Sequence, residues 1–213
     1  DLRSATLDKV SVRHVLSMNS GLSWNEWLPF SDPANTLAAA FRTSDPLRML
    51  LKRPFSDPPG SRFRYNSIST GLLVGALRSV TGMPAEQYAE TVLFRPLDIR
   101  RRLWERQAGG DVNGGWGLSL RPRDMAKIGQ LILDQGLWQG KRIVSAQWIR
   151  EMTSPRMKVD HRDYGYLIWC ESARVRDRTV GWVAAMGSGG QKIYVVPELD
   201  MVVVMTAGYR DDP

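Results

Sequence analysis

The sequence predicts an α+β fold in which helices occupy the first part of the chain and antiparallel strands the last. Two observations lead to this prediction. Apolar residues recur every three or four positions up to about residue 152, and from Tyr164 onward they give way to short runs rich in aromatic and β-branched residues. We therefore expect a mostly helical region at residues 1–157 and, at residues 158–213, the C-terminal antiparallel strands of a sheet domain.

Capping residues and glycines mark the ends of the first helices. Ser11 and Asp45 are suited as N-cap residues for short helices at residues 11–18 and 46–52, and a further short helix is expected at residues 35–42. The clearest helix has an apolar residue at every fourth position and ends at a glycine, Gly82. Its predicted buried stripe comprises Ile68, Leu72, Ala76 and Val80.

Prolines and glycines separate the later elements. Pro84 begins a helix that continues to about Phe94, and Pro122 begins another that Gly136 ends. Residues 108–117 include five glycines and are expected to form an irregular loop. The remaining predicted elements are a brief strand at 141–144, a helix capped by Ser145 that runs to about 152, and strands at 164–170, 180–186, 192–196 and 201–206.

Composition argues against several classes of protein. The apolar runs are far shorter than the roughly 20 residues of a membrane-spanning helix. One cysteine, Cys170, and two histidines provide neither a disulfide framework nor a structural zinc site, and they leave the cellular compartment open. The net charge of +7 includes an arginine cluster at residues 95–106. Because that cluster follows no known DNA-reading pattern, we interpret it as a solvated face and expect no nucleic-acid partner.

Several common catalytic motifs are absent from the sequence. It has no phosphate-binding glycine loop followed by Lys-Ser/Thr, and no His-Glu-x-x-His pair. Residues 187–189 partly match a nucleophile elbow, but Met186 stands where that motif needs a glycine, and two predicted strands flank the turn. His14 and His161 are interpreted as packed or solvated side chains rather than members of a catalytic triad.

Five segments occur in an order that is more informative than any one of them. They are SVRHVLSMNSGL at residues 11–22, RYNS at 64–67, RPRDMAKIGQ at 121–130, LWQGKRIVS at 137–145, and MGSGGQ at 186–191, which is followed by VPELD at 196–200. Together they resemble the serine β-lactamase-like hydrolases, which include class C β-lactamases, D-alanyl-D-alanine carboxypeptidases, esterases and 6-aminohexanoate-dimer hydrolases. The resemblance covers nearly the whole chain. It implies a β-lactamase/transpeptidase-like fold, with a helical region and an antiparallel sheet flanked by helices.

The resemblance also implies a reaction mechanism that uses three motifs. A Ser-x-x-Lys motif provides a nucleophile that forms an acyl-enzyme on an ester or amide substrate, without a metal or organic cofactor. Tyr65 matches the tyrosine that relays the proton, and Ser67 matches the polar third position of a Tyr-x-Ser motif. In the third motif, Gly187 precedes Ser188, whose backbone N–H is expected to donate to the oxyanion.

Further side chains are candidates for binding a small-molecule ester or amide substrate. Gly187 and Gly189 allow the backbone to approach a bound acyl group closely. Trp116 and Trp182, together with Trp169, either line an apolar acyl pocket or pack in the core. The resemblance also implies that the lysine of the Ser-x-x-Lys motif lies beside Tyr65. Its ammonium group would favour the phenolate of Tyr65, which could then accept the serine proton.

The sequence departs from the family pattern at two places. No serine is followed by a lysine three residues later, so the Ser-x-x-Lys motif is expected to lie before Asp1 in a longer protein. The chain alone is then expected to be inactive and, because neighbouring strands are missing, poorly soluble. Met186 replaces the lysine or histidine often found in relatives, which weakens the case for a β-lactam or peptidoglycan substrate. The alternative is a catalytically silent, penicillin-binding-like protein that binds a peptidoglycan-like or small-molecule ligand.

Overall fold

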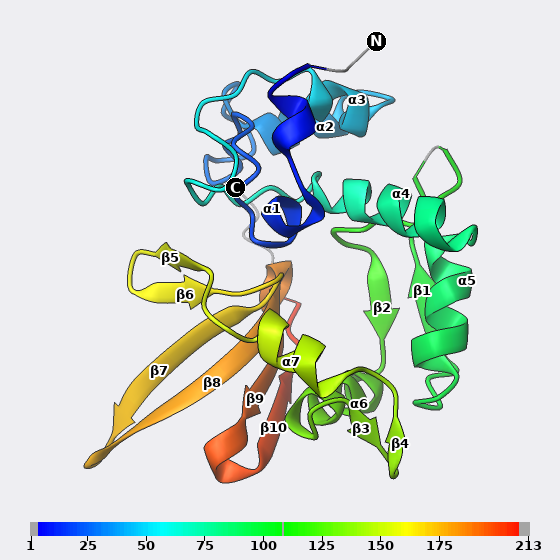
Figure 1. Ribbon diagram of the computed structural model, residues 1–213, viewed down its shortest axis with the longest axis vertical. Coiled ribbons are helices and arrows are strands. Elements are labelled where there is room, and N and C mark those ends of the chain that lie inside the picture. Colours follow the sequence, from blue (N-terminus) through cyan, green and yellow to red (C-terminus); the bar gives the residue numbers. More distant parts are fainter. Residues whose placement is uncertain (1–3, 108, 209–213) are drawn as a thin grey trace. The chain divides into compact units, whose positions relative to one another are not determined.

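The computed structural model describes residues 4–107 and 109–208, which form two compact units (Figure 1). Unit 1 contains the chain up to Tyr88 together with Trp104–Leu118, and unit 2 contains Ala89–Leu103 and the chain from Ser119 onward. Each unit is described by itself. Helices and antiparallel sheets make up the fold, as expected for the α+β class. Within the described ranges, no helix has both the length and the apolar character needed to cross a membrane.

Unit 1 is built from short helices whose starts follow the sequence signals. The side chains of Ser11, Asn35 and Asp45 accept backbone N–H groups in the first turns of three of them, which confirms the predicted caps at Ser11 and Asp45. The helical elements are η1 (Leu7–Lys9), α1 (Val12–Leu16), α2 (Thr36–Phe41), α3 (Pro46–Leu51), α4 (Thr70–Thr81) and α5 (Ala85–Ala89), the last of which ends just beyond the unit boundary.

Helix α4 is less buried than its apolar pattern predicts. It begins at Thr70, so Ile68 precedes it, and Val80 is 87% exposed, so the prediction of one buried stripe through these positions is wrong. The buried residues of α4 are Thr70 and Gly71 in its first turn, where a Cβ added at Gly71 would lie 2.9 Å from Cδ2 of Leu47 in α3. Gly82 ends the helix at a φ of 70°, as predicted.

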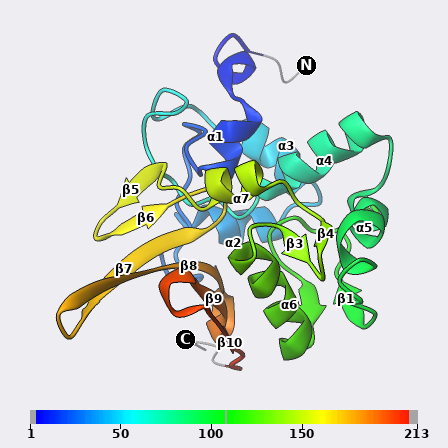
Figure 2. The same ribbon diagram turned by 60° about the horizontal axis from the view of Figure 1, so that its bottom comes forward.

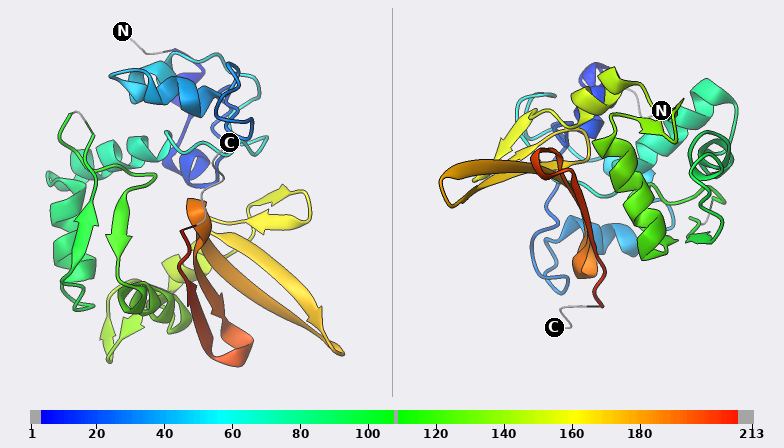
Figure 3. Two further views of the ribbon diagram at one scale, coloured as in Figure 1. Left: turned by 180° about the vertical axis from the view of Figure 1, so that it is seen from behind. Right: turned by 90° about the horizontal axis from the view of Figure 1, so that it is seen from below.

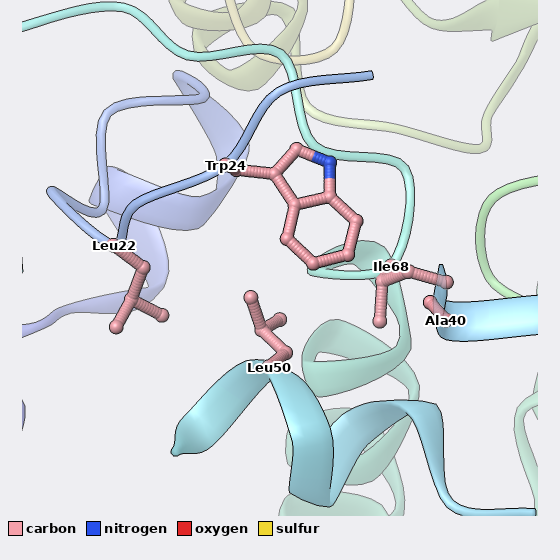
Figure 4. Packing of buried hydrophobic residues seen from close by; sticks show 5 residues of the cluster. All are labelled: Leu22, Trp24, Ala40, Leu50 and Ile68. Atoms are coloured by element: carbon pink, nitrogen blue, oxygen red, sulfur yellow. The ribbon is translucent and has the colours of Figure 1, made fainter. Parts of the chain in front are cut away.

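A small apolar core fixes the loops of unit 1. Its buried members converge around the ring of Trp24 (Figure 4). Phe55 and Trp116, which are partly buried, pack against them. Gly21 directly precedes Leu22 of this core and has a φ of 83°. A Cβ there would lie 2.3 Å from the carbonyl oxygen of Asp57, so the position requires glycine. The core therefore holds the loop before α2 against the segment before α4. Its buried residues are Leu22, Trp24, Ala40, Leu50 and Ile68.

Unit 2 contains a six-stranded antiparallel sheet in the order β10-β9-β8-β7-β6-β5. The long hairpin of β7 and β8 is clearest from behind (Figure 3). The strands are β5 (Met157–Val159), β6 (Arg162–Tyr164), β7 (Trp169–Val175), β8 (Arg178–Gly187), β9 (Gln191–Val196) and β10 (Met201–Met205). The last three confirm predicted strands, whereas β5 was not expected.

The predicted continuous strand at residues 164–170 is wrong. The chain leaves the sheet after Tyr164 and returns at Trp169, with a turn between β6 and β7. In this turn the N–H of Gly165 donates to the carbonyl oxygen of Ile168 at 2.8 Å, and Leu167 has a φ of 56°. The run of aromatic and branched residues masked the turn, because buried turn residues and strand residues look alike in sequence.

Helix α6 (Pro122–Leu133) packs on β9 and β10 of the sheet (Figure 2). The second core cluster, which includes Ile132, Ile168 and Val195, lies in this unit. The predicted helix from Pro84 to Phe94 becomes α5 followed by a π-type turn, η2. The remaining elements are η2 (Glu90–Phe94), β1 (Arg102–Trp104) paired with β2 (Leu118–Leu120), β3 (Leu137–Trp138) paired with β4 (Lys141–Arg142), α7 (Ala146–Met152), η3 (Ser188–Gly190) and η4 (Pro197–Leu199).

The arginine cluster at residues 95–106 forms ion pairs with acidic neighbours. These pairs lie partly or fully at the surface, where each contributes little to stability. They are Arg95 and Arg102 with Glu90, Arg100 with Asp98, and Arg106 with Glu86.

Gly129 allows the close approach of α6 to the sheet, and we expect Gly129→Ala to destabilise the protein. A Cβ at this position would lie 2.5 Å from Cγ1 of Val202 and 2.9 Å from Cγ2 of Ile193. Overpacking of this kind lowers the free energy of unfolding by about 1–3 kcal/mol. Gly75→Ala in α4 is the matched control, because nothing lies within 4 Å of its added Cβ. It should stabilise by about 0.5–1 kcal/mol. Urea unfolding of both variants checks this, and equal effects would contradict it.

Asp124 near the start of α6 is a buried carboxylate whose charge two cations balance. Arg121 Nε lies 2.7 Å from Oδ2 and Lys127 Nζ lies 3.0 Å from Oδ1, and the hydrogen bond from Arg121 is the main cause that lowers the pKa of Asp124. Because the folded-state pKa is lowered, the ionised group stabilises the fold above about pH 4, and this contribution disappears as the pH falls through the lowered value.

We therefore expect Asp124→Asn to cost about 1–3 kcal/mol of unfolding free energy at pH 7. The difference from wild type should shrink steadily in acid, where the wild-type carboxyl is protonated as well. Chemical unfolding at several pH values measures the effect. A difference that is independent of pH would show that the ionised carboxylate is not the stabilising form.

Candidate functional site

The Tyr65 segment, residues 64–68, lies in unit 1 directly before α4. Arg64 Nε binds Oδ2 of Asp57 at 2.7 Å, and the N–H of Arg64 donates to the carbonyl oxygen of Met18 at 2.6 Å. These bonds hold the start of the segment to two loops that precede it in sequence. The ring of Tyr65 is half-buried and lies 5.4 Å, centroid to centroid, from that of Trp27.

Ser67 is bound on both its main chain and its side chain by Glu26. Its N–H donates to Oε2 of Glu26 at 2.9 Å, and its hydroxyl donates to Oε1 at 2.7 Å. The indole N–H of Trp24 donates to the same Oε2 at 2.6 Å. Ser67 does not cap α4, whose N-cap residue is Ser69. The hydroxyl of Ser67 thus donates to the Glu26 carboxylate. The loop that contains Trp24 and Glu26 fixes the Tyr65 segment through these bonds.

The described surroundings of Tyr65 favour its neutral phenol. Burial raises the pKa of its hydroxyl above the usual value of 10, and the negative charge of Glu26 raises it further. Both causes disfavour the phenolate. The lysine that is expected to favour the phenolate belongs to the Ser-x-x-Lys motif, which this sequence does not contain.

Unit 1 contains a cavity of about 630 Å³, and its lining includes Ile68, the residue after Ser67. Phe41, Leu47, Ile68 and Trp116 form apolar parts of its lining, which also includes the charged residues Asp45, Glu105, Arg106 and Asp111. Trp116 packs against the core around Trp24 and meets Phe41 edge to face, with ring centroids 5.1 Å apart. Its ring therefore contributes to the core and lines the cavity at once, so the two alternatives for Trp116 are compatible.

The glycine turn, residues 187–190, lies in unit 2 and connects β8 to β9. Gly187 is the last residue of β8 and pairs with Gln191, while Gly189 and Gly190 have φ values of 75° and 85°. Gly187 and Ser188 are exposed. The left-handed conformations explain why glycines follow Ser188. Because the glycines have no side chains, a ligand can approach the backbone of the turn closely.

Trp182 lies in β8, five residues before Gly187, and is half-buried. It faces Glu171 of β7 in the sheet register. Its indole nitrogen Nε1 is buried without a hydrogen-bond partner among the described residues. Trp182 is thus a half-buried side chain of β8 with a buried indole nitrogen.

Sequence comparison now adds to this geometry. The family model described as "Beta-lactamase" matches residues 2–211. This chain belongs to the β-lactamase family. The 6-aminohexanoate-dimer hydrolase of Paenarthrobacter ureafaciens is 28% identical over 235 aligned residues, which cover 99% of this chain and 58% of that protein. The chain thus spans little more than half the length of this relative.

Solved structures agree on the β-lactamase fold. A Bacillus anthracis protein assigned as a 6-aminohexanoate-dimer hydrolase matches with a TM-score of 0.78 and 21% identity, over 97% of this chain and 57% of that one. A class C β-lactamase matches with a TM-score of 0.69 and 17% identity, over 99% of this chain and 67% of that one. At these identities the structural likeness shows the fold alone. With the family match, it confirms the β-lactamase/transpeptidase-like architecture.

Within this β-lactamase-family chain, the predicted site residues fall into two groups. Tyr65, Ser67 and Trp116 lie in unit 1. Trp182 and the glycine turn with Gly187, Ser188 and Gly189 lie in unit 2. The sequence prediction missed Glu26, which accepts hydrogen bonds from Ser67 and raises the pKa of Tyr65. The one available signal was a carboxylate placed between two tryptophans, Trp24 and Trp27, in an otherwise aromatic loop.

Proposed function

We propose that the protein containing this chain is a serine hydrolase that cleaves ester or amide bonds through an acyl-enzyme. The observation that carries the proposal is the match to the β-lactamase family over residues 2–211. The Tyr65 segment supports it, because residues on both sides of the half-buried Tyr65 are bound to carboxylates, Arg64 to Asp57 and Ser67 to Glu26. The proposed domain organisation is a mostly helical region at residues 1–157 and sheet strands at 158–213.

In the proposed reaction, a serine from a Ser-x-x-Lys motif outside residues 1–213 attacks the substrate carbonyl carbon. Its proton passes through Tyr65 to the leaving alcohol or amine, and the ester or amide bond breaks to leave an acyl-serine. The backbone N–H of Ser188 donates to the oxyanion that forms on the way. Water then attacks the acyl-serine and releases the acid. This sequence of steps requires neither a metal nor an organic cofactor.

The proposed substrate is a small neutral ester or amide. Met186 provides no cation for a substrate carboxylate next to the glycine turn. Gly187 and Gly189 let the backbone approach the acyl group, and Ser67 holds the main chain beside Tyr65. We propose that Trp116 forms a wall of the binding site, since it already lines a cavity, and that Trp182 supports the strand that ends in the glycine turn.

Labelling with a fluorophosphonate probe tests the proposal. The probe reacts with an activated serine, so only protein extended upstream of Asp1 should be labelled, and the 213-residue chain should not. A folded, extended protein that remains unlabelled would overturn the hydrolase proposal. It would favour the alternative of a silent ligand-binding protein, which the lack of Ser-x-x-Lys in this chain keeps open.

A further inference from the structure

Glu26 binds the Tyr65 segment through Ser67, in addition to the bonds that Arg64 makes with Asp57 and Met18, yet it lies outside every motif of the family resemblance. Its carboxylate accepts three hydrogen bonds, two from Ser67 and one from the indole of Trp24. Ser67 is 41 positions away in sequence. Trp24 belongs to the buried core, and its bond fixes the Glu26 carboxylate relative to that core. The position of Ser67 therefore depends on how the core is packed.

We infer that Glu26 is a positioning residue for Tyr65: it fixes the main chain at Ser67, two residues after Tyr65, and brings a negative charge to this segment. The inference rests on the proposed function, because Tyr65 needs exact placement only if it moves a proton during catalysis.

The contacts of the loop at residues 24–27 show how the positioning works. Glu26 holds Ser67, and its neighbour Trp27 lies against the ring of Tyr65 at 5.4 Å. The loop thus contacts the segment at two points, one polar and one aromatic. Hydrogen bonds to a carboxylate are stronger than those between neutral groups. Loss of this carboxylate leaves the N–H of Ser67 and the indole of Trp24 without their acceptor.

The charge of Glu26 gives the inference a separate observable. Burial is the larger cause of the raised pKa of Tyr65, and Glu26 is the charged residue that adds to it. Arg64, on the same segment, is paired with Asp57. Removing the charge of Glu26 should therefore lower the pKa of Tyr65 toward its ordinary value of about 10.

Two substitutions separate the hydrogen bonds from the charge. Glu26→Gln keeps an oxygen that can accept from Trp24 and from the N–H of Ser67, and its amide can donate to the Ser67 hydroxyl. Glu26→Leu removes every one of these bonds at a similar side-chain size. Asp8→Asn is the control, because it removes an exposed carboxylate from the same unit. All variants are made in the protein extended upstream of Asp1.

The readouts are steady-state hydrolysis of a short-chain ester against pH and the NMR titration of Tyr65, assigned with Tyr65→Phe. We expect Glu26→Leu to lower kcat by about 10- to 100-fold with a smaller change in KM. Glu26→Gln should restore most of kcat, while the alkaline limb of the pH profile and the Tyr65 titration both move to lower pH. Asp8→Asn should match wild type in both measurements.

A folded Glu26→Leu protein with wild-type kcat would overturn the inference, as would a Tyr65 titration that Glu26→Gln leaves unmoved. If the wild-type protein neither hydrolyses esters nor reacts with the fluorophosphonate, the proposed function fails instead. The Tyr65 titration then still tests whether the charge of Glu26 acts on the Tyr65 hydroxyl, because it needs only folded protein, and the two failures are told apart. If Glu26→Leu does not fold, the Gln variant still provides both readouts.

Discussion

Replacing Tyr65 by Phe in the protein extended upstream of Asp1 should lower kcat for ester hydrolysis by about 10²- to 10⁴-fold. Only the hydroxyl is removed, so the ring keeps its packing against Trp27 and Phe63. In the proposed mechanism, loss of the hydroxyl leaves the proton of the attacking serine without a relay to the leaving group. Fluorophosphonate labelling should slow in parallel, because the same proton must leave the serine when the probe reacts.

The control for Tyr65→Phe is a substitution that changes the same region without touching the relay. Phe63→Leu serves this purpose, because Phe63 contacts the Tyr65 ring at a centroid distance of 6.4 Å and has no hydroxyl. Both variants should unfold at temperatures close to wild type if the loss is chemical. A Tyr65→Phe protein with near wild-type kcat would remove Tyr65 from the mechanism.

The second large effect is expected at Ser188, where the backbone matters and the side chain does not. Ser188→Pro removes the N–H that is proposed to bind the oxyanion, and loss of one such donor costs about 10²- to 10³-fold in kcat. Proline suits this position, since Ser188 is the first residue of η3 and Gly187 before it is extended, with a φ of −112° and a ψ of 155°.

Ser188→Ala is the matched control, because it removes the hydroxyl and keeps the N–H. It should retain most of the wild-type kcat. Steady-state kinetics of the two variants with one ester substrate decides the matter, with circular dichroism to verify that both are folded. Both variants lack the hydroxyl, so an equally large loss of kcat in Ser188→Ala and Ser188→Pro would assign the role to the hydroxyl and contradict the backbone mechanism.

Local signals in the sequence predicted local structure well. The caps at Ser11 and Asp45 and the end of α4 at Gly82 were found because each depends on one residue and its immediate neighbours. The family fold followed from the order of five segments, and the match over residues 2–211 confirms it. The exposure of Val80 could not be read from its spacing, because periodicity describes a helix and not the neighbour that covers it.

The candidate site was predictable only in part, for a similar reason. Tyr65, Ser67 and Ser188 lie in short motifs, which the sequence displays directly. Glu26 has no motif, and its importance comes from bonds to a residue 41 positions later. A contact of that range depends on how the core around Trp24 folds, and no local pattern encodes it.

The long-range bond between Glu26 and Ser67 also has a consequence for the order of folding. Because closing a loop of this length costs conformational entropy before any contact forms, the Tyr65 segment cannot acquire its shape early as an isolated piece. The Tyr65 segment is expected to adopt its folded conformation only after the core around Trp24 has formed. The amide protons of Arg64 and Ser67 should therefore exchange with solvent in the same opening events that expose the Trp24 indole, so that exchange in the Tyr65 segment reports on the integrity of the core around Trp24.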